Sequence, residues 1–339
     1  MKEIALKSFF RSLTLKRLLN AMRAYAGYYV SVFLRRSIVW GSPVVLTVEP
    51  SSRCNLRCPQ CAVGSGKLTR KTGLLDIDKY KKIMDELGDG LIYLLLFNQG
   101  EPFMHPRLIE MIRIAKRKRI YVSVSTNGHF VDDIKLVEEL VESGCDMIII
   151  SLDAADERTY ARYRVGGNFQ RVINGIKSII EMKRSTGSAA PEIALQFLVM
   201  RQNQHQIPDF KKLARSLGVS RVLLKSVQVE DFRAAQIFLP DDEAFRRYSL
   251  ANNQLRLKAN PGSGCPRLWS SSVMLSDGSI VPCCFDKDAH FRFGTISPDS
   301  PFIPIWHSQQ YHRFRTTILR RRQSIEICHN CTRGIKIYH

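Results

Sequence analysis

The sequence predicts an α/β protein whose core is a mainly parallel sheet. Between residues 44 and 226, short apolar runs rich in β-branched residues alternate with charged amphipathic stretches. Six such runs are each followed or joined by a stretch with helical periodicity. Because strand–helix–strand crossovers are right-handed, this order favours a parallel sheet that is either open or curled toward a barrel.

The expected elements follow one another without a long interruption. Strands are expected at residues 44–49, 91–97, 121–125, 147–152, 193–200 and 221–224. Helices are expected at 76–87, 106–117, 134–143, 172–184 and 207–217. In parallel sheets functional residues gather where strands end, so motifs at these ends are candidates for a site.

The pattern divides the chain into four parts: an N-terminal helical segment (1–40), the α/β domain (41–226), a connector (227–264) and a C-terminal module (265–339). The connector is expected to hold a short helix at 241–249. In the module, Asp277-Gly278 predicts a hairpin between residues 273–275 and 279–281. The module is poor in apolar residues, which indicates that metal stabilises it.

The first forty residues predict a basic amphipathic helix. Its apolar residues recur at helical spacing, at Leu15, Leu18, Leu19, Met22, Tyr25 and Ala26. The apolar run is too short and too charged to cross a bilayer. We expect this apolar face to pack against the protein's own domain, with peripheral contact at a membrane surface as the alternative.

Composition indicates anionic partners and a reducing compartment. The 339 residues include 51 Lys and Arg against 31 Asp and Glu, a formal net charge of +20. This balance suits phosphorylated metabolites, acidic peptides or anionic lipid, and nucleic acid is not the expected partner. Nine cysteines without a secretory signal indicate metal binding in the cytoplasm more than disulfides.

Three cysteines form a compact group directly after the first expected strand. Cys54, Cys58 and Cys61 are spaced by three and then two residues. This spacing lets a short loop wrap one metal centre, and no fourth cysteine follows nearby. Three protein ligands on a four-iron cluster leave one iron open to another ligand. A zinc site or a purely structural cluster remains the alternative.

This cysteine run resembles the signature of the radical S-adenosylmethionine (SAM) superfamily. The resemblance implies a partial (β/α)6 barrel and a 4Fe-4S cluster whose open iron is chelated by SAM. One electron, from a flavodoxin- or ferredoxin-type donor, would then cleave SAM to a 5′-deoxyadenosyl radical.

The resemblance extends to the ends of later strands. Gln99-Gly100-Glu101-Pro102 is similar to the family's Gly-Gly-Glu-Pro motif, with Gln99 in place of the first glycine. Asn127 is also consistent with an ordinary turn, and His105 is expected to be a loop residue. The candidate SAM-contacting residues are Gln99, Gly100, Glu101, Asn127, Ser151, Asp153, Arg164 and Gln196.

A second cysteine group lies in the C-terminal module, at Cys265, Cys283, Cys328 and Cys331. Four thiols suit either zinc or a fully ligated four-iron cluster. The group resembles a SPASM module of the shortened Twitch type, which implies an auxiliary 4Fe-4S cluster. Cys284 and Cys145 are expected to be packed side chains, and Arg313, Arg315 and the 320–322 arginine run a solvated helix face.

Two functions follow as hypotheses. The first is a radical oxidoreductase or maturase that removes a hydrogen atom from a small polar metabolite or a peptide, with the second cluster as electron acceptor or substrate anchor. The second is a non-catalytic iron–sulfur or zinc protein that binds anionic partners. The sequence assigns no catalytic base.

Overall fold

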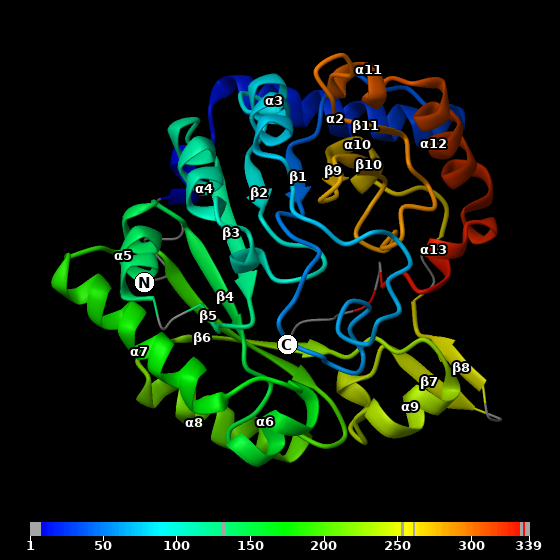
Figure 1. Ribbon diagram of the computed structural model, residues 1–339. Coiled ribbons are helices and arrows are strands. Elements are labelled where there is room, and N and C mark those ends of the chain that lie inside the picture. Colours follow the sequence, from blue (N-terminus) through cyan, green and yellow to red (C-terminus); the bar gives the residue numbers. More distant parts are fainter. Residues whose placement is uncertain (1–7, 131–132, 252–253, 260–261, 333–334, 336–339) are drawn as a thin grey trace.

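A nine-stranded sheet forms the centre of the computed structural model, which describes residues 8–130, 133–251, 254–259, 262–332 and 335. Residues 1–7 of the predicted N-terminal segment and 333–334 and 336–339 of the predicted module lie outside the described residues. The strand order is β11-β10-β9-β1-β2-β3-β4-β5-β6, and β1 to β6 are all parallel. Figure 1 shows the sheet curving, with helices along its outer side.

The six predicted strands are confirmed. They are β1 (Val45–Val48), β2 (Tyr93–Leu95), β3 (Tyr121–Thr126), β4 (Met147–Ser151), β5 (Glu192–Val199) and β6 (Arg221–Ser226). The five predicted helices are α3 (Ile77–Leu87), α4 (Leu108–Arg117), α5 (Ile134–Glu142), α7 (Phe169–Ser185) and α8 (Ile207–Ser216). Asp76, Asp133 and Asn168 cap three of these helices by accepting backbone N–H bonds in the first turn. A further short helix, α6 (Glu157–Tyr163), follows β4 and ends beside Arg164.

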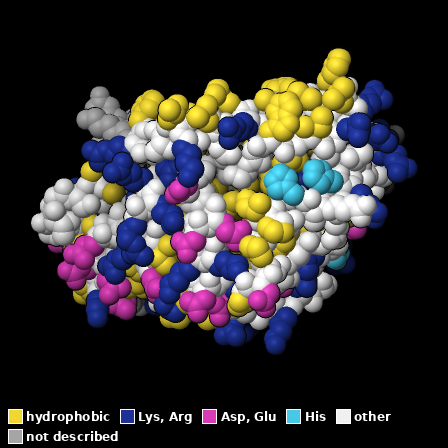
Figure 2. Space-filling model, turned by 90° about the horizontal axis from the view of Figure 1, so that it is seen from above, with side chains coloured by type: hydrophobic (Ala, Val, Ile, Leu, Met, Phe, Trp, Pro, Cys, Tyr) yellow, Lys and Arg dark blue, Asp and Glu magenta, His cyan; other side chains and the backbone are white. Residues whose placement is uncertain are grey.

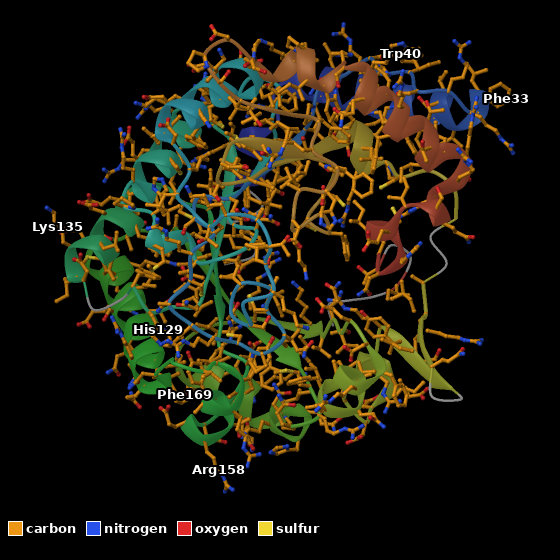
Figure 3. The ribbon with its side chains drawn as sticks, turned by 45° about the vertical axis from the view of Figure 1, so that its right-hand side comes forward. Phe33, Trp40, His129, Lys135, Arg158 and Phe169 are labelled. Carbon is orange, nitrogen blue, oxygen red and sulfur yellow. The ribbon has the colours of Figure 1, made fainter. Side chains whose placement is uncertain are left out.

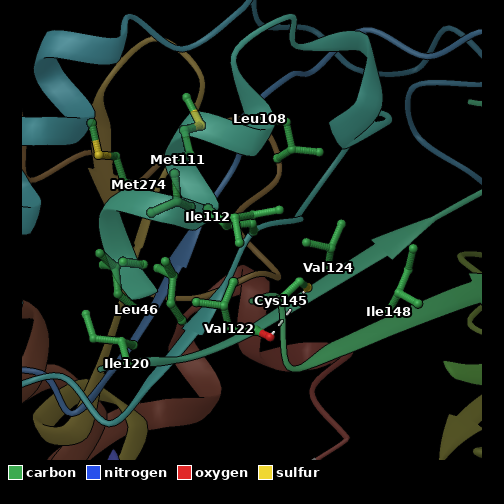
Figure 4. Close-up of a cluster of buried hydrophobic side chains, with 14 of the residues drawn as sticks. Leu46, Leu108, Met111, Ile112, Ile120, Val122, Val124, Cys145, Ile148 and Met274 are labelled. Atoms are coloured by element: carbon green, nitrogen blue, oxygen red, sulfur yellow. Dashed lines mark hydrogen bonds between the residues drawn. The ribbon is translucent and has the colours of Figure 1, made fainter. Parts of the chain in front are cut away.

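The main core lies between the sheet and its outer helices. Figure 4 shows part of it, where Val122 and Val124 of β3 pack beneath Met111 and Ile112 of α4. Cys145 is fully buried there, as predicted, and its Sγ lies 3.4 Å from the carbonyl oxygen of Met147. The core therefore fixes the strand ends from which the site loops emerge.

The C-terminal module extends this sheet. Its strand β9 (Ser271–Met274) pairs in parallel with β1, and β10 (Ser279–Val281) pairs antiparallel with β9, which confirms the predicted hairpin. The remaining elements are β11 (Gly294–Thr295), α10 (Arg267–Ser270), α11 (Phe302–Trp306), α12 (Gln309–Arg321), the 3-10 turn η4 (Arg322–Ser324) and α13 (Glu326–His329). The second cysteine group is consequently held against the first strand of the barrel.

The connector differs from its prediction. The expected helix at 241–249 is wrong: a single 3-10 turn, η3 (Glu243–Phe245), is followed by strand β7 (Tyr248–Ala251), which pairs with β8 (Gln254–Leu257). Tyr248 and Leu250 face a small second core. Alternate residues of a strand point to the same side, so a strand at this position buries both side chains. Helix α9 (Phe232–Phe238) precedes them. Two further 3-10 turns are η1 (Pro102–Met104) and η2 (Gln204–Gln206).

The N-terminal helix α2 (Leu15–Leu34) exists as predicted but packs with the opposite face. Arg17, Ala24, Gly27, Tyr28 and Ser31 are its buried residues. The predicted packing residues are instead all exposed: Leu15, Leu18, Leu19, Met22, Tyr25 and Ala26. The physical reason is that small side chains permit close backbone packing, while the Arg17 guanidinium donates hydrogen bonds to several backbone carbonyls, among them those of Gly88 and Lys118. None of the helices in the described ranges could span a bilayer.

Candidate active site

The first cysteine group lies in the loop that leaves the carboxyl end of β1. Cys58 is buried, while Cys54 and Cys61 are partly exposed. Burial raises the pKa of the Cys58 thiol to about 11, and burial also raises the pKa of Cys54. The Cys61 backbone N–H donates to the Cys58 carbonyl, which closes the tight turn between them. The three thiols therefore lie on one short loop at the strand end, as predicted.

Gly100 holds the motif after β2 against this loop. Its φ is +72°, and a Cβ atom there would lie 2.4 Å from the Ser51 carbonyl oxygen and 2.7 Å from that of Arg53. The Glu101 backbone N–H donates to the Arg53 carbonyl at 2.7 Å. Only glycine permits so close an approach of two backbones. The motif thus positions the residue that precedes Cys54.

Glu101 joins the ends of β2 and β3. Its buried carboxylate accepts hydrogen bonds from Thr126 Oγ1 at 2.7 Å, the Asn127 N–H at 2.7 Å and the Phe103 N–H at 3.2 Å. Burial raises the pKa of Glu101. A carboxylate can accept about four hydrogen bonds, so the Glu101 carboxylate can accept one more in addition to these three.

Asn127 reaches from the end of β3 toward the cysteine loop. Its Nδ2 donates to Asn55 Oδ1 at 2.7 Å and lies 3.8 Å from Cys54 Sγ. Its Oδ1 accepts the N–H of His129 at 3.0 Å. Asn127 is therefore a turn residue that lies beside the first thiol, and its contact with SAM stays a prediction.

The candidates after β4 and on β5 form two pairs. Ser151 and Gln196 are cross-strand neighbours, and Gln196 Nε2 donates to Ser151 Oγ at 3.1 Å. Asp153, at a positive φ of 60°, accepts a hydrogen bond from Arg164 Nε at 2.7 Å. Arg164 Nη1 in turn lies 3.9 Å from Cys58 Sγ. The structure thus links all four residues to the strand ends around the first cysteine group.

Two site residues were missed by the sequence analysis. Glu49, the last residue of the β1 region, accepts hydrogen bonds from the backbone N–H of Gln99 at 3.1 Å and of Ser276 at 3.2 Å. Arg70 pairs with Glu49 at 2.7 Å. A single acid and a single arginine carry no spacing pattern, so only the fold reveals them.

The second cysteine group surrounds one cavity of about 310 Å³. Cys265, Cys283, Cys328 and Cys331 line it, together with apolar side chains that include Leu268, Phe314 and Ile318. Burial raises the pKa of Cys283 well above its ordinary value. The four thiols predicted from spacing are thus brought together in a mostly apolar space.

The structure corrects three predictions around this cavity. Arg322 is buried, and its Nη2 lies 3.1 Å from Cys331 Sγ. Arg315 is also buried, because it lies over the rings of Trp306 and Tyr311 and donates to the carbonyls of Leu268 and Trp306. Neither belongs to a solvated helix face. Cys284, expected to be packed, is exposed.

His105 lies, as predicted, in a loop, between η1 and α4. It is buried, with Nε2 2.8 Å from the Leu75 carbonyl oxygen.

The loop that follows the first cysteine group is bonded to the loop that follows Cys283 of the second group. Thr69 donates from its N–H and its Oγ1 to Asp288 Oδ1 at 2.6 and 2.7 Å. Arg70 Nε donates to the Lys287 carbonyl at 2.6 Å. The connector covers the first loop as well, since Val227 and Val229 share a core cluster with Cys58. The two cysteine groups therefore belong to one continuous structure.

The four C-terminal cysteines fit a four-iron cluster, because all of them line one mostly apolar cavity. Across the described ranges, no three His, Cys, Asp or Glu side chains lie close enough to bind one metal ion. In a four-iron cluster each cysteine binds a different iron, so the thiols surround a larger object. The cavity among the four C-terminal cysteines is of that kind.

Comparison with known families decides the classification. The family model described as the radical SAM superfamily matches residues 48–213, and a SPASM iron–sulfur cluster-binding domain matches residues 265–332. The chain belongs to the radical SAM superfamily. It is therefore an enzyme whose cofactors are SAM and two 4Fe-4S clusters. The non-catalytic alternative is set aside.

Relatives of this radical SAM enzyme span most of its length. It is 27% identical over 301 residues to the tungsten-containing aldehyde ferredoxin oxidoreductase cofactor-modifying protein of Pyrococcus furiosus, covering 80% of this chain and 82% of that protein. It is 26% identical to the mycofactocin maturase MftC of Mycobacterium ulcerans, covering 86% and 80%. It is 30% identical to the PqqA peptide cyclase of Gluconobacter oxydans, covering 55% and 50%.

Solved structures show the same fold. SuiB of Streptococcus suis, bound to S-adenosylmethionine, superposes with a TM-score of 0.63 at 17% identity, covering 88% of this chain and 74% of SuiB. BtrN in complex with AdoMet and 2-DOIA superposes with a TM-score of 0.52 at 18% identity, covering 87% and 95%. The parallel sheet with its C-terminal cysteine-rich module is thus the partial barrel that the sequence predicted.

Proposed function

We propose that this enzyme oxidises or cross-links a peptide substrate by radical chemistry at the carboxyl ends of β1 to β5. Cys54, Cys58 and Cys61 hold a four-iron cluster with one iron left to SAM. Cys265, Cys283, Cys328 and Cys331 hold the second cluster. The observation that carries this proposal is the placement of three thiols on one loop without a fourth cysteine, together with a separate cavity lined by four thiols.

The first cluster, when bound and reduced, supplies the electron that cleaves SAM to methionine and a 5′-deoxyadenosyl radical. The residues of this chain hold and orient the reactants. Glu101 retains one acceptor position for the SAM ammonium group, and Ser151 with Gln196 offers hydroxyl and amide groups for its polar atoms. Arg164, fixed by Asp153, places a cation beside Cys58. A flavodoxin- or ferredoxin-type donor reduces the protein.

A peptide substrate is favoured over a small metabolite by the relatives. The PqqA peptide cyclase acts on a peptide by its printed name, and this chain is 30% identical to it over 187 residues. In the proposed reaction the substrate C–H bond gives its hydrogen atom to the 5′-deoxyadenosyl radical. Loss of one further proton and one further electron from the substrate completes a two-electron oxidation. The cluster that Cys265, Cys283, Cys328 and Cys331 would hold could supply the acceptor for that electron.

The test is anaerobic incubation of the reconstituted protein with SAM and dithionite. The proposal expects 5′-deoxyadenosine from the wild-type protein and none from a Cys54→Ala, Cys58→Ala, Cys61→Ala variant. Cys145→Ala is the matched control, because Cys145 is a buried core thiol that belongs to neither group and lies just before the amino end of β4. A peptide substrate added to the same reaction should lose two mass units, whether it is oxidised or internally cross-linked. Absence of 5′-deoxyadenosine from a protein with full iron content would overturn the proposal.

A further inference from the structure

The exposed face of α2 is the most apolar surface among the described residues. Most of the exposed large hydrophobic side chains of the described chain lie between residues 9 and 40. Phe33 is 86% exposed, Tyr29 66% and Trp40 54%. Figure 3 shows Phe33 and Trp40 at the outer edge of the molecule, pointing away from it. Monomeric proteins rarely leave so large an apolar area open to water without a partner.

The helix does not expose this face through loose packing. Its opposite face is bonded to the barrel: Arg17 donates to the carbonyls of Gly88 and Arg119, and Asn20 Nδ2 donates to those of Ser42 and Gly90. Tyr28 packs edge to face on Trp269 at 5.3 Å. Helix α2 is thus held rigidly, and rotating it to bury the exposed residues would break these bonds. The packing of α2 on the barrel therefore fixes the exposure of its apolar face.

The charge around this face indicates its occupant. Residues 4–48 contain several Lys and Arg and no Asp or Glu. Arg11, Arg23, Arg35 and Arg36 are exposed, and Arg320 of α12 adds a further cation by donating to the Arg35 carbonyl at 3.2 Å. Figure 2 shows the hydrophobic side chains in a row, with Lys and Arg beside them. Asp89, paired with Lys16 at 2.7 Å, is an exposed acid beside this helix, so the flanking charge is mainly but not solely cationic. An apolar strip with such a surplus of cations is complementary to a bilayer surface with anionic headgroups.

We propose that α2, with Trp40, docks this enzyme on the surface of a membrane that contains anionic lipid. The helix would lie in the plane of the interface, with Phe33, Tyr29 and Met22 entering the acyl boundary. The arginines would contact the headgroups. This inference is independent of the proposed reaction and its substrate.

The docked orientation leaves the active site accessible. Gly88 and Gly90 precede β2, and Lys118 and Arg119 precede β3, so α2 is attached at the amino ends of the strands. The loop of the first cysteine group leaves from the carboxyl end of β1 (Figure 1). A protein bound through α2 therefore directs its site away from the bilayer, toward substrates in the aqueous phase.

Trp40 provides a direct reporter of docking. The other two tryptophans, Trp269 and Trp306, are fully buried, so a change in the solvent exposure of tryptophan on binding comes from Trp40. The experiment mixes the reconstituted full-length protein with phosphatidylcholine vesicles, either pure or containing phosphatidylglycerol. Expected are flotation with the anionic vesicles, a blue shift of the emission, and quenching by brominated acyl chains. Binding should weaken with rising salt.

Matched variants test whether membrane binding depends on this face or on exposed apolar and basic residues in general. Tyr29→Ser with Phe33→Ser should lower the partition coefficient about tenfold or more. Ile134→Ser with Ile237→Ser removes two exposed apolar side chains elsewhere, 71% and 55% exposed, and should leave it unchanged. Arg35→Gln with Arg36→Gln should weaken binding to anionic vesicles, whereas Lys211→Gln with Lys212→Gln on α8 should not.

Three outcomes would overturn the inference. The first is no flotation of the wild-type protein with anionic vesicles. The second is equal loss of binding in the Tyr29/Phe33 variant and the Ile134/Ile237 control. The third is a dimer in sedimentation velocity that Phe33→Ser dissociates, which would assign the face to a second copy of the chain. Production of 5′-deoxyadenosine without vesicles should be the same in all these variants, because none of the residues belongs to the site.

Discussion

Arg70 places Nη2 2.7 Å from each carboxylate oxygen of Glu49, and both side chains are buried. The same carboxylate accepts the backbone N–H groups of Gln99 and Ser276. One ion pair therefore connects the cysteine loop, the motif after β2 and the hairpin of the C-terminal module.

Removing the cation of this pair should be strongly destabilising. Arg70→Met leaves the Glu49 charge buried without a partner, so the free energy of unfolding should fall by about 3–5 kcal/mol. Urea denaturation of the iron-free protein measures it. Arg107→Met, which breaks the exposed pair with Glu110, is the control and should change little. Equal effects of the two substitutions would contradict the role given to Glu49.

Gly100→Ala should displace the cysteine loop. The new Cβ would meet two backbone carbonyls, which cannot rotate away. Gly66→Ala is the matched control, because Gly66 has nearly the same φ, +71°, with nothing within 4 Å of the added Cβ. We expect Gly66→Ala to cost about 1–2 kcal/mol from backbone strain and to retain SAM cleavage. Gly100→Ala should lose both stability and cleavage; unchanged cleavage would show that the close contact is unimportant.

Replacing two adjacent cysteines one at a time should distinguish a cluster ligand from a cysteine that binds no iron. Cys283 lines the cavity, whereas Cys284 is exposed next to it. Cys283→Ala should reduce iron from about eight to about four atoms per chain, because a four-iron cluster needs its ligands, and Cys284→Ala should not. Iron analysis after anaerobic reconstitution decides this. A larger loss in the Cys284 variant would reverse the assignment.

Arg322 should raise the reduction potential of the second cluster. Its guanidinium lies 3.1 Å from Cys331 Sγ, and a cation there stabilises the reduced form, which carries one more negative charge. Arg322→Gln should therefore shift the potential downward in an EPR-monitored titration. Arg321→Gln, at an exposed position, serves as the control. A potential that does not move relative to this control would refute the assignment.

The sequence predicted the barrel and both cysteine groups because periodicity and cysteine spacing are local. It failed where burial depends on distant partners. The buried face of α2 is set by Arg17 and the carbonyls near residues 88 and 118, not by the apolar stripe. Arg315 lies within α12 and Arg322 directly follows it. Both are buried, because Arg315 packs over the Tyr311 ring and Arg322 lies beside the Cys331 thiol. Glu49 and Arg70 form their ion pair only in the folded protein, where the loop after the first cysteine group returns to the end of β1.

The central claim is that the iron centre held by Cys54, Cys58 and Cys61 has one corner open to SAM. The most direct measurement is hyperfine spectroscopy on reduced protein whose four C-terminal cysteines are replaced by alanine, mixed with SAM carrying 15N in its amino group. The account predicts a coupling between the cluster spin and that nitrogen, absent without SAM. A cluster signal that SAM leaves unchanged, with no nitrogen coupling, would contradict it.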